Sequence, residues 1–241
     1  MPLLADPDGG TSGTALAVVI PAYQAAATIR HVWSGVLDAV PHAAVWVVDD
    51  GSTDGTAGQV PGDQVLRHPV NRGKGAALRT GITKALERRP AWIVTLDADG
   101  QHPPEEIPRL LEPLERGLAD LTLGARARSE AMPLPRRFTN WLSSTLATRI
   151  GGVGVPDAQT GFRAFSAHLA RSVKPSEAGY DFEAAFLLAS LAGGWRVLSV
   201  PVPTIYGRSR SHFKAGVDTW RMARVFWKYA GRIVSGARWT S

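Results

Sequence analysis

The chain has 241 residues, of which 44 % are hydrophobic and 20 % charged, a balance that is ordinary for a globular protein with one well-buried core. It contains no cysteine, which excludes disulfides and thiolate zinc sites and suits a cytoplasmic protein. Its formal net charge of +6 predicts attraction to anions: nucleic acid, phosphorylated substrates or an acidic membrane surface.

The N-terminal segment, residues 1–14, is rich in Gly, Pro, Asp and Ser without periodicity, so we expect a flexible tail. It lacks the apolar run after a positive start that marks a signal peptide. No apolar run approaches the about 18–20 residues that a bilayer-spanning helix needs. We therefore expect one domain over residues 15–215 that does not span a membrane, although it could lie on one.

The first half of the chain alternates strand and helix patterns. Its apolar strand patterns cover Leu16–Ile20, Val45–Val48, Gln64–Arg67 and Trp92–Leu96. Helical patterns cover Thr28–Val40 and a second stretch whose apolar residues share one helix face, namely Leu78, Ile82, Ala85 and Leu86. The alternation predicts an α/β fold with a mostly parallel central sheet flanked by helices, in which ligands bind beyond the carboxyl ends of the strands.

The second half of the chain is less regular. We expect strands at Leu121–Ala125 and Arg196–Val202 and helices at Arg136–Ile150 and Asp181–Ala192. The last stretch, residues 216–241, has an amphipathic helix pattern in which a stripe of Arg and Lys lies opposite Trp and Phe. Such a helix suits an anionic membrane surface, but it is equally consistent with a helix packed on the domain, or with a dimer contact.

The most informative acidic pair is Asp97 and Asp99, directly after an apolar strand. Two carboxylates at this spacing can converge where the chain turns. Hard oxygen ligands with open positions suit Mg²⁺ or Mn²⁺, with substrate phosphates completing the coordination shell. Gln101 or His102 could add a ligand. The alternative is a solvated acidic turn before a helix that begins near Pro103.

Two further polar turns lie at expected strand ends or helix starts. Asp49–Gly55 carries carboxylates that can accept hydrogen bonds from a nucleobase or a ribose; alternatively, Ser52 or Asp54 caps a helix. Asn71–Gly75 brings glycine-rich backbone and a lysine to a helix start, which favours an anion, although the spacing is not that of a Walker A loop.

Together these segments resemble the family-2 glycosyltransferases of GT-A fold, and most closely the polyprenyl-phosphate sugar synthases, the group that includes dolichol-phosphate mannose synthase. The resemblance covers about residues 16 to 215. The matching motifs, in family order, are Val19–Tyr23, Val47–Thr56, Asn71–Gly75, Leu96–Pro104, Gly124–Arg126, Asp157–Arg163, Tyr180–Glu183 and Val200–Pro203.

The resemblance implies a donor site at the carboxyl edge of the sheet. The residues implied to contact the nucleotide lie at the ends of the first two strands and in the glycine-rich turn. They are Pro21, Tyr23, Asp49, Asp50 and Lys74. Asp97, Asp99 and Gln101 would bind a divalent metal on the donor pyrophosphate, with Ala98 beside them. Where family members often carry Asn-Glu after the tyrosine, this chain has Gln24-Ala25, which puts the identity of the base in doubt.

The same resemblance suggests where the pyrophosphate and an acceptor would bind. Arg210 and His212 belong to a basic segment that relatives close over the pyrophosphate, or else to a solvated loop. An anionic acceptor would be drawn by Arg126 and Arg137, with Arg136 as a substitute.

Two other residues of this half have competing interpretations. Arg163 could replace the acceptor-binding arginines, or could serve as a structural ion-pair partner. Asp157 would orient the acceptor or take a proton, or would instead anchor the turn at residues 159–161.

We therefore expect an inverting, metal-dependent hexosyltransferase that uses a GDP-mannose or UDP-glucose type of donor and a polyprenyl or dolichyl phosphate acceptor. It would act in the cytoplasm, with peripheral binding to the inner face of the membrane and homo-oligomers as further possibilities. The alternatives are a soluble saccharide or small-molecule acceptor, an inactive relative that only binds, and, more distantly, a nucleic-acid-binding module.

Overall fold

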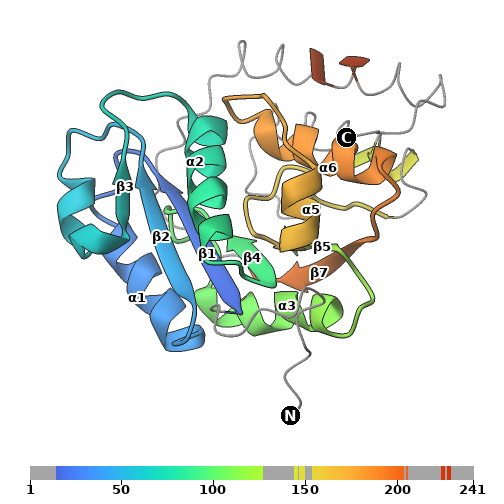
Figure 1. Cartoon of the computed structure of the whole chain (residues 1–241), viewed down its shortest axis with the longest axis horizontal. Helices are drawn as coiled ribbons and strands as arrows, with labels where there is room; N and C mark the ends of the chain where they lie inside the picture. The colour runs from blue at the N-terminus through green and yellow to red at the C-terminus, as the bar shows by residue number, and fades with distance from the viewer. Residues whose placement is uncertain are drawn as a thin grey trace.

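A central β-sheet runs through the part of the chain that the computed structural model describes, which is residues 15–126, 144–145, 147–149, 154–203, 205, 224–225 and 227–228. In these residues the sheet has seven strands in the order β3-β2-β1-β4-β6-β5-β7. Figure 1 labels all of these strands except β6. Their bounds are β1 Leu16–Ala22, β2 Ala44–Asp49, β3 Val65–Arg67, β4 Trp92–Thr95, β5 Leu121–Arg126, β6 Arg163–Ser166 and β7 Val197–Val202.

The strand directions bring several strand ends to one edge of the sheet. Strands β3, β2, β1 and β4 are mutually parallel, and β5 pairs in parallel with β7, whereas β6 is antiparallel to both β4 and β5. In the register, Ala22 at the end of β1 lies beside Asp49 at the end of β2. The polar turns after β1, β2 and β4 therefore meet at the same carboxyl edge.

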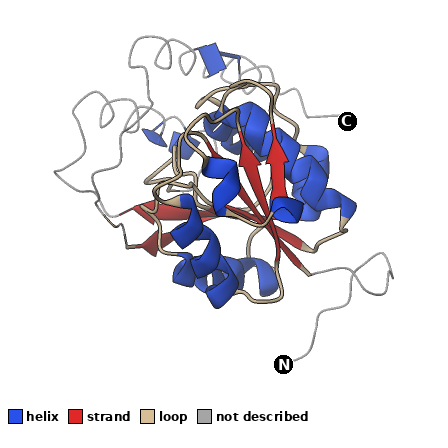
Figure 2. Ribbon diagram, turned by 90° about the vertical axis from the view of Figure 1, so that its left-hand side faces the viewer, coloured by secondary structure: helices blue, strands red, loops and turns tan. Residues whose placement is uncertain are grey.

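Helices cover both faces of the sheet (Figure 2). The longer helices are α1 Ile29–Ala39, α2 Lys74–Glu87, α3 Ile107–Glu115, α5 Ala167–Ser172 and α6 Phe182–Ala192. Short 3₁₀ turns are η1 Thr56–Gln59, η2 Gly62–Gln64 and η3 Pro104–Glu106.

The sequence of β1 shows why two layers of helices are needed. Ala17 and Val19 belong to the core under α2, α5 and α6, whereas Val18 and Ile20 belong to the core under α1 and α3. All four side chains are fully buried, because alternate residues of a strand face opposite sides of the sheet.

The fold class and most expected elements are confirmed, and where bounds were predicted the ends agree to within two residues. The helix expected near Pro103 starts as η3 and continues as α3. Strand β6 and helix α5 were not expected, since β6 has only four residues and starts with a charged one. The N-terminal tail lies outside the described residues, as do most of the helices expected at Arg136–Ile150 and within residues 216–241.

Helix α2 approaches β1 and β2 so closely that Gly81 leaves no room for a side chain. A Cβ atom there would collide with a methyl group of Val19 and would lie 3.0 Å from one of Val48. Both methyl groups belong to stiff side chains in the buried sheet, so the backbone of α2 would have to move.

We predict that Gly81→Ala lowers the free energy of unfolding by about 1–2 kcal/mol, because overpacking outweighs the gain in helix propensity. Urea denaturation followed by circular dichroism measures the change. Gly58→Ala in η1 is the control, since a Cβ there meets no atom within 4 Å. A Gly81→Ala variant more stable than the wild type would contradict this packing.

Candidate functional site

Asp97 and Asp99 leave the sheet directly after β4. Between them, Ala98 is buried in the core, and its carbonyl oxygen accepts a hydrogen bond of 2.6 Å from the Thr28 hydroxyl. Asp99 Oδ1 accepts the backbone N–H of Gln101 at 3.0 Å, which shapes the turn. Both aspartates are half-buried at the carboxyl edge, and the Asp97 side chain is 26 % exposed although its Oδ1 is buried.

The Lys74 ammonium lies between two carboxylates. Its Nζ is 2.6 Å from Asp97 Oδ1 and 2.6 Å from Glu183 Oε1, and it also lies 5.8 Å from the centre of the Tyr180 ring. Burial alone would lower the pKa of Lys74, but the two carboxylates outweigh burial and raise it above its ordinary value. Lys74 is therefore a fixed positive charge beside the first aspartate of the expected metal site.

The glycine-rich turn before α2 permits this arrangement by close packing. A Cβ on Gly75 would lie 2.6 Å from the carbonyl oxygen of Glu177 and 2.7 Å from Cβ of Phe182. The N–H of Ala76 also donates to the carbonyl oxygen of Ala178 at 3.1 Å. The turn thus brings the start of α2 against the segment that leads into α6, which carries Glu183.

Asp50 holds the same turn from the other side. This buried carboxylate accepts the backbone N–H of Arg72 on Oδ1 at 2.9 Å and that of Gly73 on Oδ2 at 2.8 Å. His68 Nδ1 lies 2.6 Å from Oδ1, and Nε2 of the same ring lies 3.0 Å from the Thr80 hydroxyl. Both oxygens of Asp50 are therefore occupied within the protein, and its expected contact with the nucleotide stays a prediction.

Asp49 is similarly engaged. It is fully buried, its Oδ1 accepts the N–H of Ser52 at 3.0 Å, and its Oδ2 lies 3.3 Å from Arg67 Nε. Pro21 is buried in β1, whereas the neighbouring Tyr23 is 37 % exposed at the strand end. Of the expected nucleotide-lining residues, Tyr23 therefore offers an accessible surface in this structure.

The turn after β2 builds the neighbouring loop between β1 and α1. Three consecutive N–H groups of that loop, at Gln24, Ala25 and Ala26, donate to Ser52 Oγ, Thr56 Oγ1 and Asp54 Oδ2 at 2.9, 2.9 and 3.0 Å. Burial would raise the pKa of Asp54, but hydrogen bonds from Thr56 and Ala26 outweigh burial and lower it. Ser52 and Asp54 therefore stabilise the loop between β1 and α1 by accepting hydrogen bonds from its backbone.

Gln24 itself was not expected to have a role in this loop. Its side chain bonds Thr53 twice, since Nε2 donates to Oγ1 and Oε1 accepts the Thr53 N–H, both at 3.1 Å. Its backbone φ of +51° lies in the left-handed region. Gln24 thus fixes the loop where many family members carry asparagine, next to Tyr23.

Arg163 takes a structural place. Its side chain is buried and donates to three carbonyl oxygens: those of Thr160 at 2.8 Å, Glu183 at 2.6 Å and Ala158 at 2.9 Å. Burial lowers the pKa of Arg163 to about 10, against the effect of nearby carboxylates, so the group is cationic at neutral pH. The expectation that Arg163 could bind the acceptor is wrong, because its guanidinium does not reach the surface.

Asp157 is buried, and its Oδ1 accepts the N–H of Gln159 at 3.3 Å. This contact supports the anchoring interpretation, while a role toward the acceptor stays a prediction. Arg136, Arg137, Arg210 and His212 lie outside the described residues, and of Arg126 only the backbone, at the end of β5, is described.

The residues after β4 fit a divalent cation that also binds phosphate. Asp97, Asp99 and Gln101 supply oxygen donors from one turn, which is the ligand type that Mg²⁺ and Mn²⁺ prefer. His102 is buried with its ring 5.3 Å from that of Phe162, in the core. Within the described ranges, no three or more Asp, Glu, His or Cys residues form a metal-binding group, so substrate phosphates would have to complete the shell.

A mostly parallel sheet with helices on both faces matches the GT-A fold, the architecture of nucleotide-sugar-dependent glycosyltransferases. The model of the family "Glycosyl transferase family 2" matches residues 17–173, and the chain belongs to this family. It is therefore a glycosyltransferase by family.

Two named relatives illustrate the family. The undecaprenyl-phosphate mannosyltransferase of Micrococcus luteus is 32 % identical over 198 residues, which are 76 % of this chain and 81 % of the relative. The polyprenol monophosphomannose synthase of Mycolicibacterium smegmatis is 31 % identical over 201 residues, 77 % of this chain and 75 % of the relative.

A solved structure confirms the fold. Glucosyl-3-phosphoglycerate synthase from Mycobacterium tuberculosis, in complex with Mn²⁺, UDP-glucose and phosphoglyceric acid, superposes with a TM-score of 0.76. It is 23 % identical, and the match covers 91 % of this chain and 80 % of that one.

We predict that Asp50→Asn lowers the free energy of unfolding by about 2–3 kcal/mol. An amide has one acceptor oxygen, so its NH₂ group would face the N–H of Arg72 or Gly73. Thermal and urea denaturation measure the effect, with Asp63→Asn, on the exposed η2 turn, as the control. Equal stability of the two variants would show that Asp50 does not hold the turn.

Proposed function

We propose that this protein transfers a hexose from a nucleotide diphosphate sugar to a polyprenyl phosphate. The observation that carries the proposal is the placement of Asp97 and Asp99, half-buried at the carboxyl edge of the sheet, in a member of glycosyltransferase family 2. Two relatives whose alignments cover about three quarters of this chain have names that describe mannosyl transfer involving polyprenyl phosphates. These names support this acceptor class.

On the donor side, Asp97, Asp99 and Gln101 would hold Mg²⁺ or Mn²⁺. A metal held there would supply positive charge that stabilises the diphosphate leaving group. The GT-A neighbour was solved with Mn²⁺ and UDP-glucose, which supports a divalent metal but does not choose between GDP and UDP donors here. Tyr23 presents an exposed ring at the end of β1, beside the loop that Gln24 fixes, and would contact the nucleotide.

On the acceptor side, a polyprenyl phosphate is already anionic at neutral pH, so no strong general base is needed. Asp157 is buried, and its Oδ1 accepts the backbone N–H of Gln159. This environment fits a reaction in which Asp157 is not needed as a base. Arg126 and Arg137 would attract the acceptor phosphate by charge. Its oxygen would attack the anomeric carbon opposite the departing diphosphate, which gives inversion in a single displacement.

A lipid acceptor requires contact with a membrane surface. None of the described helices is long and apolar enough to cross a bilayer. Near the C-terminus, Val225 is buried in the core, and Lys228 lies 2.8 Å from Glu177. Trp227 in the same stretch is 86 % exposed. We infer that this stretch packs on the domain and presents Trp227 to the interface of an anionic membrane.

The test is transfer of radiolabelled sugar from GDP-mannose and from UDP-glucose to undecaprenyl phosphate in the presence of Mn²⁺. We expect an organic-extractable, mild-acid-labile product with one of the two donors. Label that stays in the aqueous phase with both donors, while a soluble acceptor is glycosylated, would contradict the lipid acceptor.

We predict that Asp99→Asn lowers this turnover by at least about 100-fold and that EDTA abolishes it, because the diphosphate loses the cation that stabilises its charge. Asp38→Asn, an exposed carboxylate on α1, is the matched control and should retain wild-type turnover. Full activity of Asp99→Asn, or of the EDTA-treated enzyme, would exclude the assigned metal role.

A further inference from the structure

Glu183 is a buried carboxylate for which the expected chemistry has no use. It is 4 % exposed in the first turn of α6. Both of its carboxylate oxygens are buried, its ion-pair partner is the Lys74 ammonium, 2.6 Å from Oε1, and the buried Arg163 guanidinium adds a further electrostatic attraction. A buried charge is costly unless it is paired, so this carboxylate depends on Lys74 for its place in the protein.

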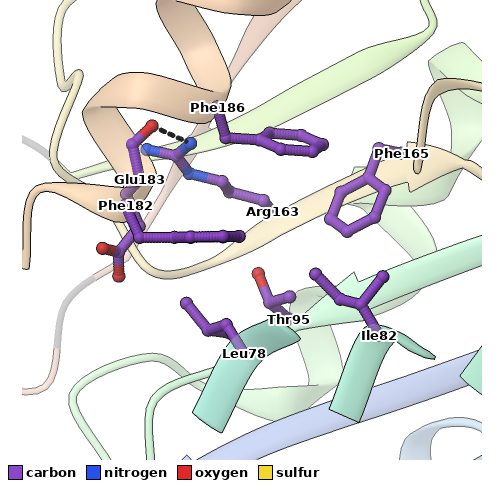
Figure 3. A pocket seen from close by; sticks show the side chains of 8 residues that line it. All are labelled: Leu78, Ile82, Thr95, Arg163, Phe165, Phe182, Glu183 and Phe186. Carbon is purple, nitrogen blue, oxygen red and sulfur yellow. Dashed lines mark hydrogen bonds between the residues drawn. The ribbon is translucent and has the colours of Figure 1, made fainter. Parts of the chain in front are cut away.

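The surroundings of Glu183 make its charge effective over several ångströms. Its main chain is fixed, because its carbonyl oxygen accepts the hydrogen bond from Arg163, while its carboxylate points away from Phe165 and Phe186 (Figure 3). The two rings, with Leu78 and Phe182, line a cavity of about 10 Å³, which holds at most one water molecule. Both carboxylate oxygens of Glu183 are themselves buried, so its charge is weakly screened.

Lys74 therefore has two competing anions at equal distance. It lies 2.6 Å from Glu183 and 2.6 Å from Asp97, while the Asp97 side chain is 26 % exposed and that of Glu183 is 5 % exposed. Glu183, the more buried carboxylate, cannot readily replace its contact with the ammonium by hydrogen bonds to water. Glu183 thus retains Lys74 and limits how completely Lys74 can neutralise Asp97.

We propose that Glu183 is a positioning residue of the donor site, which holds the Lys74 ammonium away from full pairing with Asp97 and so keeps Asp97 able to bind a divalent cation. The proposal rests on the proposed function, in that it assumes a metal at Asp97 and Asp99. It adds a residue of α6 to the turns after β1, β2 and β4 at the carboxyl edge of the sheet.

The test measures Mn²⁺ binding directly, by the electron paramagnetic resonance signal of free Mn²⁺, on the full chain with saturating GDP or UDP. We predict that Glu183→Gln raises the dissociation constant for Mn²⁺ about threefold to tenfold, because Lys74 then pairs with Asp97 alone. In a Lys74→Gln background the same substitution should change the constant by less than about twofold, because no ammonium remains to be held.

A purely structural role for Glu183 makes a different prediction: the loss in Mn²⁺ binding would persist in the Lys74→Gln background. That result, or unchanged binding by Glu183→Gln alone, would overturn the inference. Should Glu183→Gln not fold, Glu183→Asp, which keeps the charge but draws the ammonium toward α6, must change Mn²⁺ binding for the inference to hold.

Asp120→Asn controls for general loss of stability, since Asp120 forms an ion pair of 2.9 Å with Arg196 at the other end of the sheet. It should leave Mn²⁺ binding unchanged. A wild-type protein that binds no Mn²⁺ would contradict the proposed metal site itself, whereas normal wild-type binding with an unaffected Glu183→Gln variant contradicts only the role of Glu183.

Discussion

The pairing of one buried ammonium with two carboxylates is the interaction around which this site is arranged. Lys74 begins α2, Asp97 follows β4 and Glu183 lies in α6, so three separate elements meet at one positive charge. Because unpaired charges are costly away from water, none of the three side chains can move independently. This constraint ties the glycine-rich turn, the paired-aspartate turn and the helix of the second half into one unit.

The acidic and hydroxyl-rich turns at the carboxyl edge act largely by shaping backbone. Asp50 uses both carboxylate oxygens to hold the turn before α2, and Ser52, Asp54 and Thr56 hold three N–H groups of the loop after β1. A donor site needs such preorganised loops, since flexible ones would have to be ordered at the expense of binding energy. Motifs that suggest direct contacts with a nucleotide can therefore serve by positioning other residues, such as Tyr23 in the proposed donor site.

The sequence alone predicts the α/β class, the strands of the first half and the edge at which the aspartates gather, because these follow from local periodicity and from the rules of parallel sheets. The antiparallel β6 escaped prediction, since four residues carry too little pattern. For Arg163 the sequence left an acceptor-binding and a structural role open, and for Glu183 it indicated no role, because both depend on contacts between segments that are distant in sequence. The Tyr180–Glu183 motif indicated that this segment matters, but nothing in it indicated that Glu183 pairs with Lys74.

Family membership also decides between functions that composition left open. The net charge of +6 is compatible with nucleic acid as well as with phosphorylated substrates, and only the ordered motifs and the family match favour the latter. Charge alone indicates attraction to anions, whereas the family match indicates the class of reaction.

The most direct test of the metal site is a crystal structure with Mn²⁺ and GDP or UDP, with diffraction data recorded at the manganese absorption edge. An anomalous peak within about 2–2.5 Å of carboxylate oxygens of Asp97 or Asp99, and in contact with the nucleotide phosphates, is the predicted result. A manganese ion bound elsewhere, or phosphates seated without any ion while both aspartates turn into the protein, would contradict it.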